Sequence, residues 1–221
     1  MISGFPSNAR TTRTLYDNGK ISLEEANHIL IFSHFANPVF ILSTVAVFFL
    51  HNEKVGIIIL VAHYLSNFIL GIIFRKYSPS ISNNSNVKKN TIDGFASIFI
   101  LSIRNAIDTI ITICGILAMF LMLSTIIIDL FNFNTYNTIL IKSIFEMTTG
   151  IESLGVLNLS MTFKVILCSG ILSFGGVCVH VQVLSQITGT DIKYIYFLIG
   201  RIYQMIISVF IAYLLCLIFK I

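Results

Sequence analysis

The stretch LSFGGVCVHVQVLSQITG, Leu172 to Gly189, interrupts the apolar run from Met161 to Ile187. That run is long enough to cross a bilayer, since an α-helix needs about 20 residues to span the hydrocarbon core. It nevertheless contains the pair Gly175-Gly176 together with a histidine and an amide. Backbone freed at a helix break cannot stay unpaired in lipid, so such a break survives only inside protein or beside a watery cavity. The stretch therefore predicts a membrane protein with a broken helix.

The composition of the chain supports the same class. Of its 221 residues, 56% are hydrophobic and only 11% are charged, whereas soluble domains carry roughly 25% charged residues. We therefore expect an all-α polytopic membrane protein with about five transmembrane helices, some broken or re-entrant, and with interfacial amphipathic helices. The other expected spans are Val55 to Phe74, Thr109 to Ile128, Tyr194 to Phe219, and a run from His28 to Leu50 that is broken at Asn37-Pro38.

The loop from Arg75 to Asn90 indicates the orientation and the division of the chain. It carries four basic residues and no acid, so the positive-inside rule places it in the cytoplasm. Its polar part is typical of a connector between two halves. We expect a partial two-repeat architecture, with the second half of a first repeat in residues 1–77, a linker in 78–90 and a second repeat in 91–221.

Two segments are amphipathic and too polar to span the membrane. In Ile21 to Phe32, Ser22 and Glu25 have the spacing of a capping box, and we expect this helix at the cytoplasmic interface. The segment from Asp93 to Arg104 has a similar apolar side. The alternative for both is a plain N-terminal extension of the following span.

The opening stretch ISGFPSNAR, Ile2 to Arg10, is a counterpart of the broken run. At one constant offset Ser3 aligns with Ser173 and Gly19 with Gly189. Corresponding broken helices in two halves indicate a transporter site, and half-helix N-termini carry a partial positive charge that suits an anion. Arg10 and His180 come just after the two breaks. The alternatives are that the glycines only allow close helix packing and that Arg10 reaches the lipid headgroups.

A third polar segment, FEMTTGIES, runs from Phe145 to Ser153 and is too short and too polar to span. It is either a re-entrant segment or a solvated external loop. Carboxylates at membrane depth mark ion or proton pathways, so Glu146, if buried, is the first candidate for coupling to a cation or proton. Asp108 and Arg201 flank or enter spans, and each is either an interfacial anchor or a site residue.

Several classes of function find no support in the sequence. The four cysteines lie in apolar runs without a Cys-x-x-Cys pair, which argues against a metal site. We find no nucleotide-binding glycine loop, no Gly-x-Ser-x-Gly and no His-Glu-x-x-His motif, so we expect neither an enzyme nor a cofactor. No basic, aromatic-laced stripe suggests nucleic acid. The start of the chain lacks the basic region and apolar core of a signal peptide.

Three stretches together resemble a known family, namely SGFPSNARTTRTLYDNGKISLEEANHIL, FANPVF and LSFGGVCVHVQVLSQITGTDIKYIYFLIGR. They are similar to the sporulation integral membrane proteins of endospore-forming bacteria, within the nucleoside-recognition or Gate-domain group. The resemblance implies a multi-span protein with two related halves that is needed in spore formation and is associated with moving dipicolinate into the developing spore. Members of that family are longer and carry the SGFP element in mid-chain, so we expect this chain to correspond to their C-terminal part.

The resemblance also implies the residues of the site. It assigns to the first broken element Ser3, Gly4, Phe5, Pro6 and Arg10, to the second Phe174, Gly175, Gly176, His180 and Gln182, to the polar helix break Asn37 and Pro38, and to the intervening hairpin Glu146 and Gly150.

The expected function is transport of a small anion, with dipicolinate as the substrate that the resemblance implies. One alternative is a nucleoside or other neutral-solute transporter that reads its ligand with Asn37, Gln182 and Gln204. Another is a non-transporting assembly protein needed for spore formation. We expect the protein to lie in the lipid bilayer, and the resemblance implies the membrane around the developing spore. A second copy of the chain and other sporulation membrane proteins are both left open as binding partners.

Overall fold

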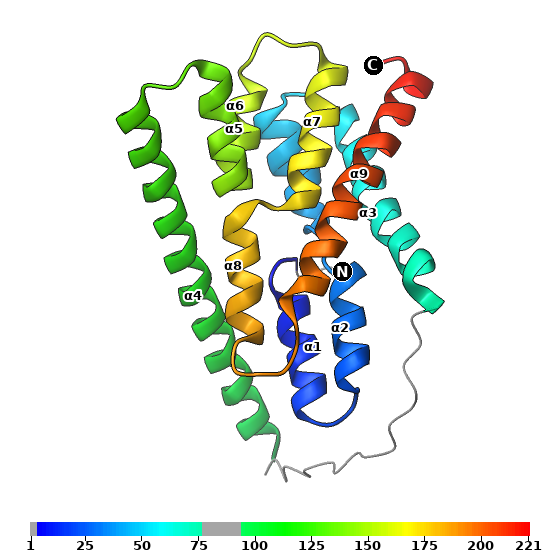
Figure 1. Ribbon diagram of the computed structural model, residues 1–221, viewed down its shortest axis with the longest axis vertical. Helices are drawn as coiled ribbons and strands as arrows, with labels where there is room; N and C mark the ends of the chain where they lie inside the picture. The colour runs from blue at the N-terminus through cyan, green and yellow to red at the C-terminus, as the bar shows by residue number, and fades with distance from the viewer. Residues whose placement is uncertain (1–3, 77–93) are drawn as a thin grey trace.

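The computed structural model describes residues 4–76 and 94–221, and the regular elements in these parts are all helices (Figure 1). The predicted linker 78–90, Asp93 and the site residue Ser3 therefore lie outside the described residues. The elements are α1 (Ser7–Asp17), α2 (Leu23–Phe32), the π-helix η1 (Phe40–Phe49), α3 (Glu53–Ile73), the short 3-10 helix η2 (Phe74–Lys76), α4 (Gly94–Phe131), α5 (Thr135–Phe145), α6 (Met147–Gly155), α7 (Met161–Phe174), α8 (Gly176–Ile187) and α9 (Tyr194–Phe219).

Four segments of the described chain are long and apolar enough to cross a membrane. They are α3, α4, the pair α7–α8 and α9. The prediction of an all-α polytopic membrane protein is confirmed. The run from His28 to Leu50 is interrupted near Asn37-Pro38 as expected, since α2 ends at Phe32 and η1 begins at Phe40.

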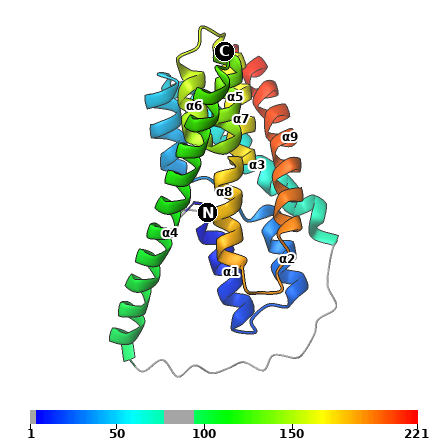
Figure 2. The same cartoon turned by 60° about the vertical axis from the view of Figure 1, so that its left-hand side comes forward.

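Two helical hairpins, α1–α2 and α5–α6, lie toward opposite ends of the molecule (Figures 1 and 2). In the view of Figure 1, α1 and α2 meet in a turn at the lower end, while α5 and α6 point their shared tip downward from the upper end. Gly150 lets α5 and α6 approach closely, because a Cβ there would collide with the backbone of Ser143. The segment 145–153 therefore forms the tip of this hairpin and most of α6, and it is not a plain loop.

The interfacial position expected for α2 stays a prediction, but the structure shows what the apolar face of this helix contacts. Its capping box is present as predicted: the Ser22 side chain accepts a hydrogen bond from the backbone N–H of Glu25, and the Glu25 side chain accepts one from the backbone N–H of Ser22. However, α2 stands in the bundle, with Leu30 fully buried and Gly200 of α9 against the backbone of Ile31. An apolar helix face can be covered by protein as well as by lipid, and here α9 covers it.

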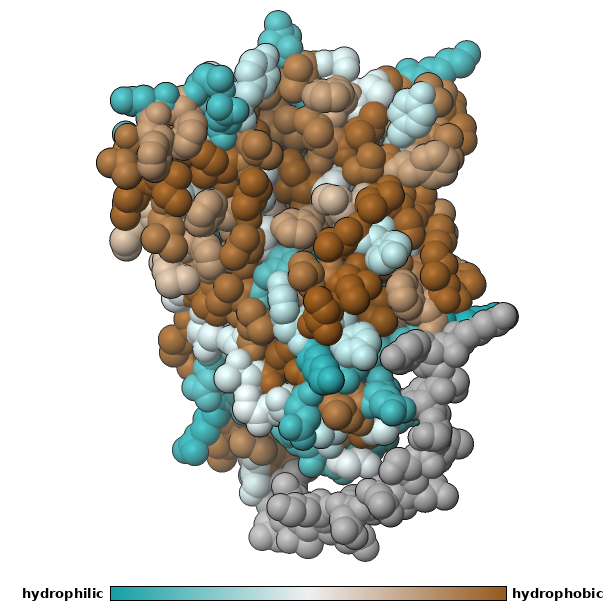
Figure 3. All heavy atoms as spheres, viewed as in Figure 1, coloured by the Kyte–Doolittle hydropathy of each residue, from teal (hydrophilic) through white to brown (hydrophobic). Residues whose placement is uncertain are grey.

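Helix α4 is continuous from Gly94 to Phe131, so the segment before Arg104 is an extension of the following span. This was the alternative to a separate interfacial helix. Most of α4 is exposed; it packs mainly against α5 and α8, and Arg10 of α1 also donates hydrogen bonds to it. On the face drawn in Figure 3, apolar residues cover most of the molecule, and hydrophilic residues lie at both ends, with the larger group toward the lower end.

Candidate functional site: a cavity between broken helices

A cavity of about 210 Å³ lies where the start of α1, the break before η1, the tip between α5 and α6, and the first turns of α8 meet. It is smaller than the roughly 300–1,000 Å³ of pockets for drug-sized ligands, so it suits a small solute. Its lining is Gly4, Phe5, Ala36, Asn37, Phe40, Ile113, Leu117, Glu146, Met147, Thr148, Cys178, Val179 and Gln182.

The first wall of the cavity is the start of α1 and the break before η1. Gly4 has a positive φ of 71° and lies against Asn37, so that a Cβ there would be 3.4 Å from the Asn37 backbone nitrogen. The Asn37 side chain accepts a hydrogen bond of 2.8 Å from the backbone N–H of Val39. This bond satisfies one of the donors that a helix start leaves free, and it fixes the polar break that Asn37-Pro38 predicts.

The second wall is the tip between α5 and α6. The Glu146 carboxylate accepts hydrogen bonds from the backbone N–H groups of Thr148 at 2.9 Å and Thr149 at 2.8 Å. It therefore caps α6 while remaining only 4% exposed. A carboxylate held this way is stabilised by two charge-assisted bonds and by the helix dipole, so Glu146 is a buried acid beside the cavity.

The third wall begins at the glycine pair. Gly175 ends α7 with a φ of 89°, and Gly176 opens α8 with a φ of 67°. L-residues rarely adopt such angles, whereas glycine does so readily. A Cβ at Gly176 would also lie 3.2 Å from three backbone atoms of the α5–α6 tip. Glycine thus permits both the turn and the contact between the broken helix and the hairpin.

The structure brings together part of the predicted site. Gly4, Phe5, Asn37, Glu146 and Gln182 line the same cavity. Pro6 precedes the first turn of α1, and Phe174, Gly175 and Gly176 form the break itself. That any of these residues binds a solute stays a prediction.

Neither of the two predicted cationic groups lines this cavity. The Arg10 guanidinium donates hydrogen bonds to the Asn105 carbonyl and the Thr109 hydroxyl of α4. His180 is buried between Phe174 and Tyr194, where its Nε2 lies 3.1 Å from the Phe174 carbonyl and its Nδ1 lies 2.6 Å from the Tyr194 hydroxyl. Because a carbonyl only accepts, Nε2 carries the proton and Nδ1 accepts from Tyr194.

Sequence reasoning missed a polar core next to the cavity. Arg201 is fully buried; its guanidinium donates to the His34 carbonyl at 3.1 Å and to the Asn67 Oδ1 at 3.2 Å, and it lies over the Phe197 ring at 5.4 Å. In the described part of the chain no acid forms an ion pair with it. The sequence signal was an arginine within an apolar span, which is costly unless protein surrounds it.

His63 ties this core to two of the breaks. Its Nε2 accepts a hydrogen bond of 3.0 Å from the backbone N–H of Ala36, which lines the cavity. Its Nδ1 then carries the proton and faces the Ser173 hydroxyl at 3.1 Å, two residues before Gly175. A single side chain on α3 therefore holds the break before η1 and the end of α7 at a fixed separation.

Comparison with known proteins supports the family resemblance. The sporulation integral membrane protein YlbJ of Bacillus subtilis (strain 168) is 27% identical over 240 aligned residues, which cover 92% of this chain and 59% of that protein. The chain thus spans about three fifths of the length of the curated relative that it matches. No protein-family model matches the sequence, and no solved structure matches the chain. The expected resemblance to the sporulation integral membrane proteins is confirmed, and the chain is an integral membrane protein similar to them.

Proposed function

We propose that this protein moves a small solute across the membrane during sporulation, with the solute passing through the cavity between the broken helices. The observation that carries the proposal is the meeting of three helix breaks around one cavity inside an apolar bundle. Irregular backbone at membrane depth is tolerated where it is buried in protein or lines a water-filled cavity, and discontinuous helices form the substrate sites of many transporters. The role in sporulation rests on the similarity to YlbJ, which is named as a sporulation integral membrane protein.

The first candidate substrate is a small aromatic anion such as dipicolinate, as the family resemblance implies. The starts of α1 and η1 lie at the cavity, and backbone N–H groups at helix starts favour an anion, whereas the start of α6 is already capped by the Glu146 carboxylate. Phe5 offers a ring to an aromatic solute. The source and the sink of the solute would then be the compartments on either side of a membrane around the developing spore.

A neutral solute is the second candidate, because of the groups that line the cavity. Asn37, Thr148 and Gln182 are neutral hydrogen-bonding residues, and among the described lining residues Glu146 is the one with a formal charge. Amides both donate and accept hydrogen bonds, which suits a nucleoside base. This lining favours the neutral candidate over an assembly protein without a ligand.

Direct binding separates these candidates. Purified full-length chain in lipid nanodiscs is incubated with labelled dipicolinate or with a labelled nucleoside, and bound label is counted. Gln182→Leu, which removes an amide from the cavity, should weaken binding of the true ligand, whereas Gln186→Leu, one helical turn further along α8, should not change equilibrium binding at the cavity. Binding of neither compound by the wild type would contradict the proposal and favour an assembly role.

A further inference from the structure

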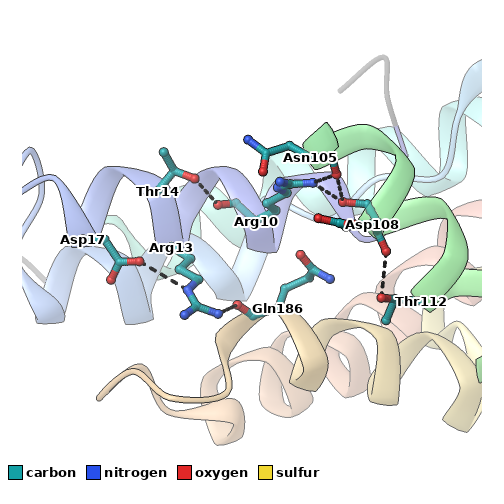
Figure 4. Close-up of a pocket in the computed structure, with 9 residues that line it drawn as sticks. Arg10, Arg13, Thr14, Asp17, Asn105, Asp108, Thr112 and Gln186 are labelled. Atoms are coloured by element: carbon teal, nitrogen blue, oxygen red, sulfur yellow. Dashed lines mark hydrogen bonds and ion pairs between the residues drawn. The ribbon is translucent and has the colours of Figure 1, made fainter. Parts of the chain in front are cut away.

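A second, polar cavity of about 300 Å³ lies between α1, α4 and α8 (Figure 4). Helix α1 contributes one stripe of side chains at helical spacing, namely Arg10, Arg13, Thr14 and Asp17. Helix α4 contributes a facing stripe with the same spacing, namely Asn105, Asp108, Thr109 and Thr112. Residues three, four and seven apart lie on one helix face, so two polar faces look at each other across this space.

The two cavities follow one another along the same three segments. On the α1 segment, Gly4 and Phe5 line the central cavity and Arg10 to Asp17 line the polar one. On α4, Ile113 and Leu117 line the central cavity, and residues between Asn105 and Thr112, earlier on the same helix, line the polar one. On α8, Gln182 lines the central cavity and Gln186, one turn later, lines the polar one.

Arg10 lies near the boundary between the two cavities. Its guanidinium reaches from α1 to α4 and bonds the Asn105 carbonyl and the Thr109 hydroxyl (Figure 4). Thr109 is one turn before Ile113, the first α4 residue of the central cavity. Arg13 makes a comparable link from α1 to the Gln186 carbonyl of α8 at 2.9 Å. The seam is therefore closed by hydrogen bonds and not by apolar packing alone.

From this geometry we propose that the seam between α1, α4 and α8 is the hydrated route by which the solute reaches the central cavity, and that Arg10 is the latch that closes it. The route opens toward the end of the molecule that carries the α1–α2 turn, because α1 runs from the central cavity to that turn (Figure 1). Water and a polar solute can move between two polar helix faces. The apolar residues elsewhere on α4 offer them no hydrogen-bonding partners. The inference rests on the proposed function of the central cavity.

Cys178 provides a natural reporter for this route. It lines the central cavity, is 1% exposed and has a free thiol. We would replace Cys114, Cys168 and Cys216 by alanine, insert the full chain into oriented vesicles and add a charged, membrane-impermeant thiol reagent to one side. Labelling of Cys178 is expected from the side of the α1–α2 turn. Labelling only from the opposite side, or no labelling in any variant, would overturn the route.

Two bulky substitutions on α4 form a matched pair. Thr112→Trp places a large side chain in the polar cavity and should abolish labelling of Cys178. Ile111→Trp adds a tryptophan at the neighbouring position, which is 65% exposed on the outside of α4, and should leave the labelling rate unchanged. Equal rates in the two variants would overturn the route, and a matching unfolding temperature confirms that both are folded.

The latch is tested by Arg10→Ala in the same background. Loss of a hydrogen bond to a charged group should raise the open population, so labelling should be about tenfold faster or more. An unchanged or slower rate would show that Arg10 does not close the seam. If the seam carries reagent to Cys178 while no solute is bound or transported, the route stands and the proposed function fails. If solute is transported while Thr112→Trp has no effect on labelling, the route fails and the proposed function stands.

Discussion

At the scale of single residues, Glu146 offers the clearest test of how the α5–α6 tip is built. Glu146→Ala removes both acceptors of the α6 cap, and loss of an N-cap costs about 0.5–2 kcal/mol of stability. Glu146→Gln keeps one acceptor and should cost less. Thermal unfolding of the purified chain measures both, with the exposed Glu152→Gln as the control. An alanine variant as stable as the wild type would contradict the capping role.

Gly176 tests the contact between the broken helix and the hairpin. Gly176→Ala combines a left-handed backbone angle with a Cβ 3.2 Å from three backbone atoms, whereas Gly189→Ala has the backbone angle alone and open space around it. The left-handed angle costs an L-residue about 1–2 kcal/mol. We therefore expect both variants to lose stability and Gly176→Ala to lose clearly more, together with solute binding. Equal losses on thermal unfolding would argue against a functional contact.

The residues that break helices could be predicted from the sequence, and most of their partners could not. Glycine and proline act through local backbone geometry, so the breaks at Gly175-Gly176 and Asn37-Pro38 are visible in the chain itself. The surroundings of Arg201 depend on His34 and Asn67, which are more than a hundred residues away in sequence. An arginine in an apolar run looks the same in sequence whether it anchors at the interface or lies in the core.

At the scale of elements, Arg201 links α9 to α3 and to the break before η1. Arg201→Lys keeps the charge but loses the planar fork that holds two separate acceptors. The single ammonium nitrogen of lysine cannot take the place of both guanidinium nitrogens, which hold the His34 carbonyl and the Asn67 oxygen separately, so we expect a loss of stability of about 1–3 kcal/mol. The exposed Arg104→Lys is the control. If both variants unfold at the same temperature as the wild type, Arg201 does not hold these elements together.

The placement of α2 shows where element prediction ends. The sequence predicts the capping box and the apolar face of α2, but it does not show whether lipid headgroups or protein covers that face. That choice depends on α9, which lies against α2 through Gly200, and on the bond of 2.7 Å that the Lys193 backbone donates to the Asn27 side chain. The turns at Gly19 and Gly189 both use a positive φ, of 65° and 82°. The internal repeat that aligns them stays a prediction.

At the scale of the whole molecule, the positive-inside rule predicts which end faces the cytoplasm. The α1–α2 turn and the loop between α6 and α7 lie at opposite ends (Figure 1). If the basic loop from Arg75 to Asn90 is cytoplasmic, a cysteine at the exposed Lys20 should be protected from an impermeant reagent outside intact cells. A cysteine at the exposed Asn158 should react. The reverse pattern would invert the orientation, and cells opened with detergent provide the control.

The sequence predicts the architecture of the whole molecule better than it predicts which side chains meet in the site. Apolar runs and their interruptions depend on solvation, which acts residue by residue, so the helical membrane class and the broken helices follow from the chain. Arg10 does not line the central cavity because its side chain bonds α4, which packs beside α1. No local sequence pattern predicts that these two helices lie side by side.

Solute uptake by reconstituted protein tests the central claim most directly. Liposomes containing the full chain are mixed with labelled dipicolinate or a labelled nucleoside, and trapped label is followed over time against protein-free liposomes. The matched variants are Val179→Phe, which fills the central cavity, and Ile206→Phe, which is 58% exposed on α9. We predict uptake of one of the two solutes by the wild type and by Ile206→Phe, and its loss in Val179→Phe. Uptake of neither solute, or equal uptake by a folded Val179→Phe variant, would contradict the account.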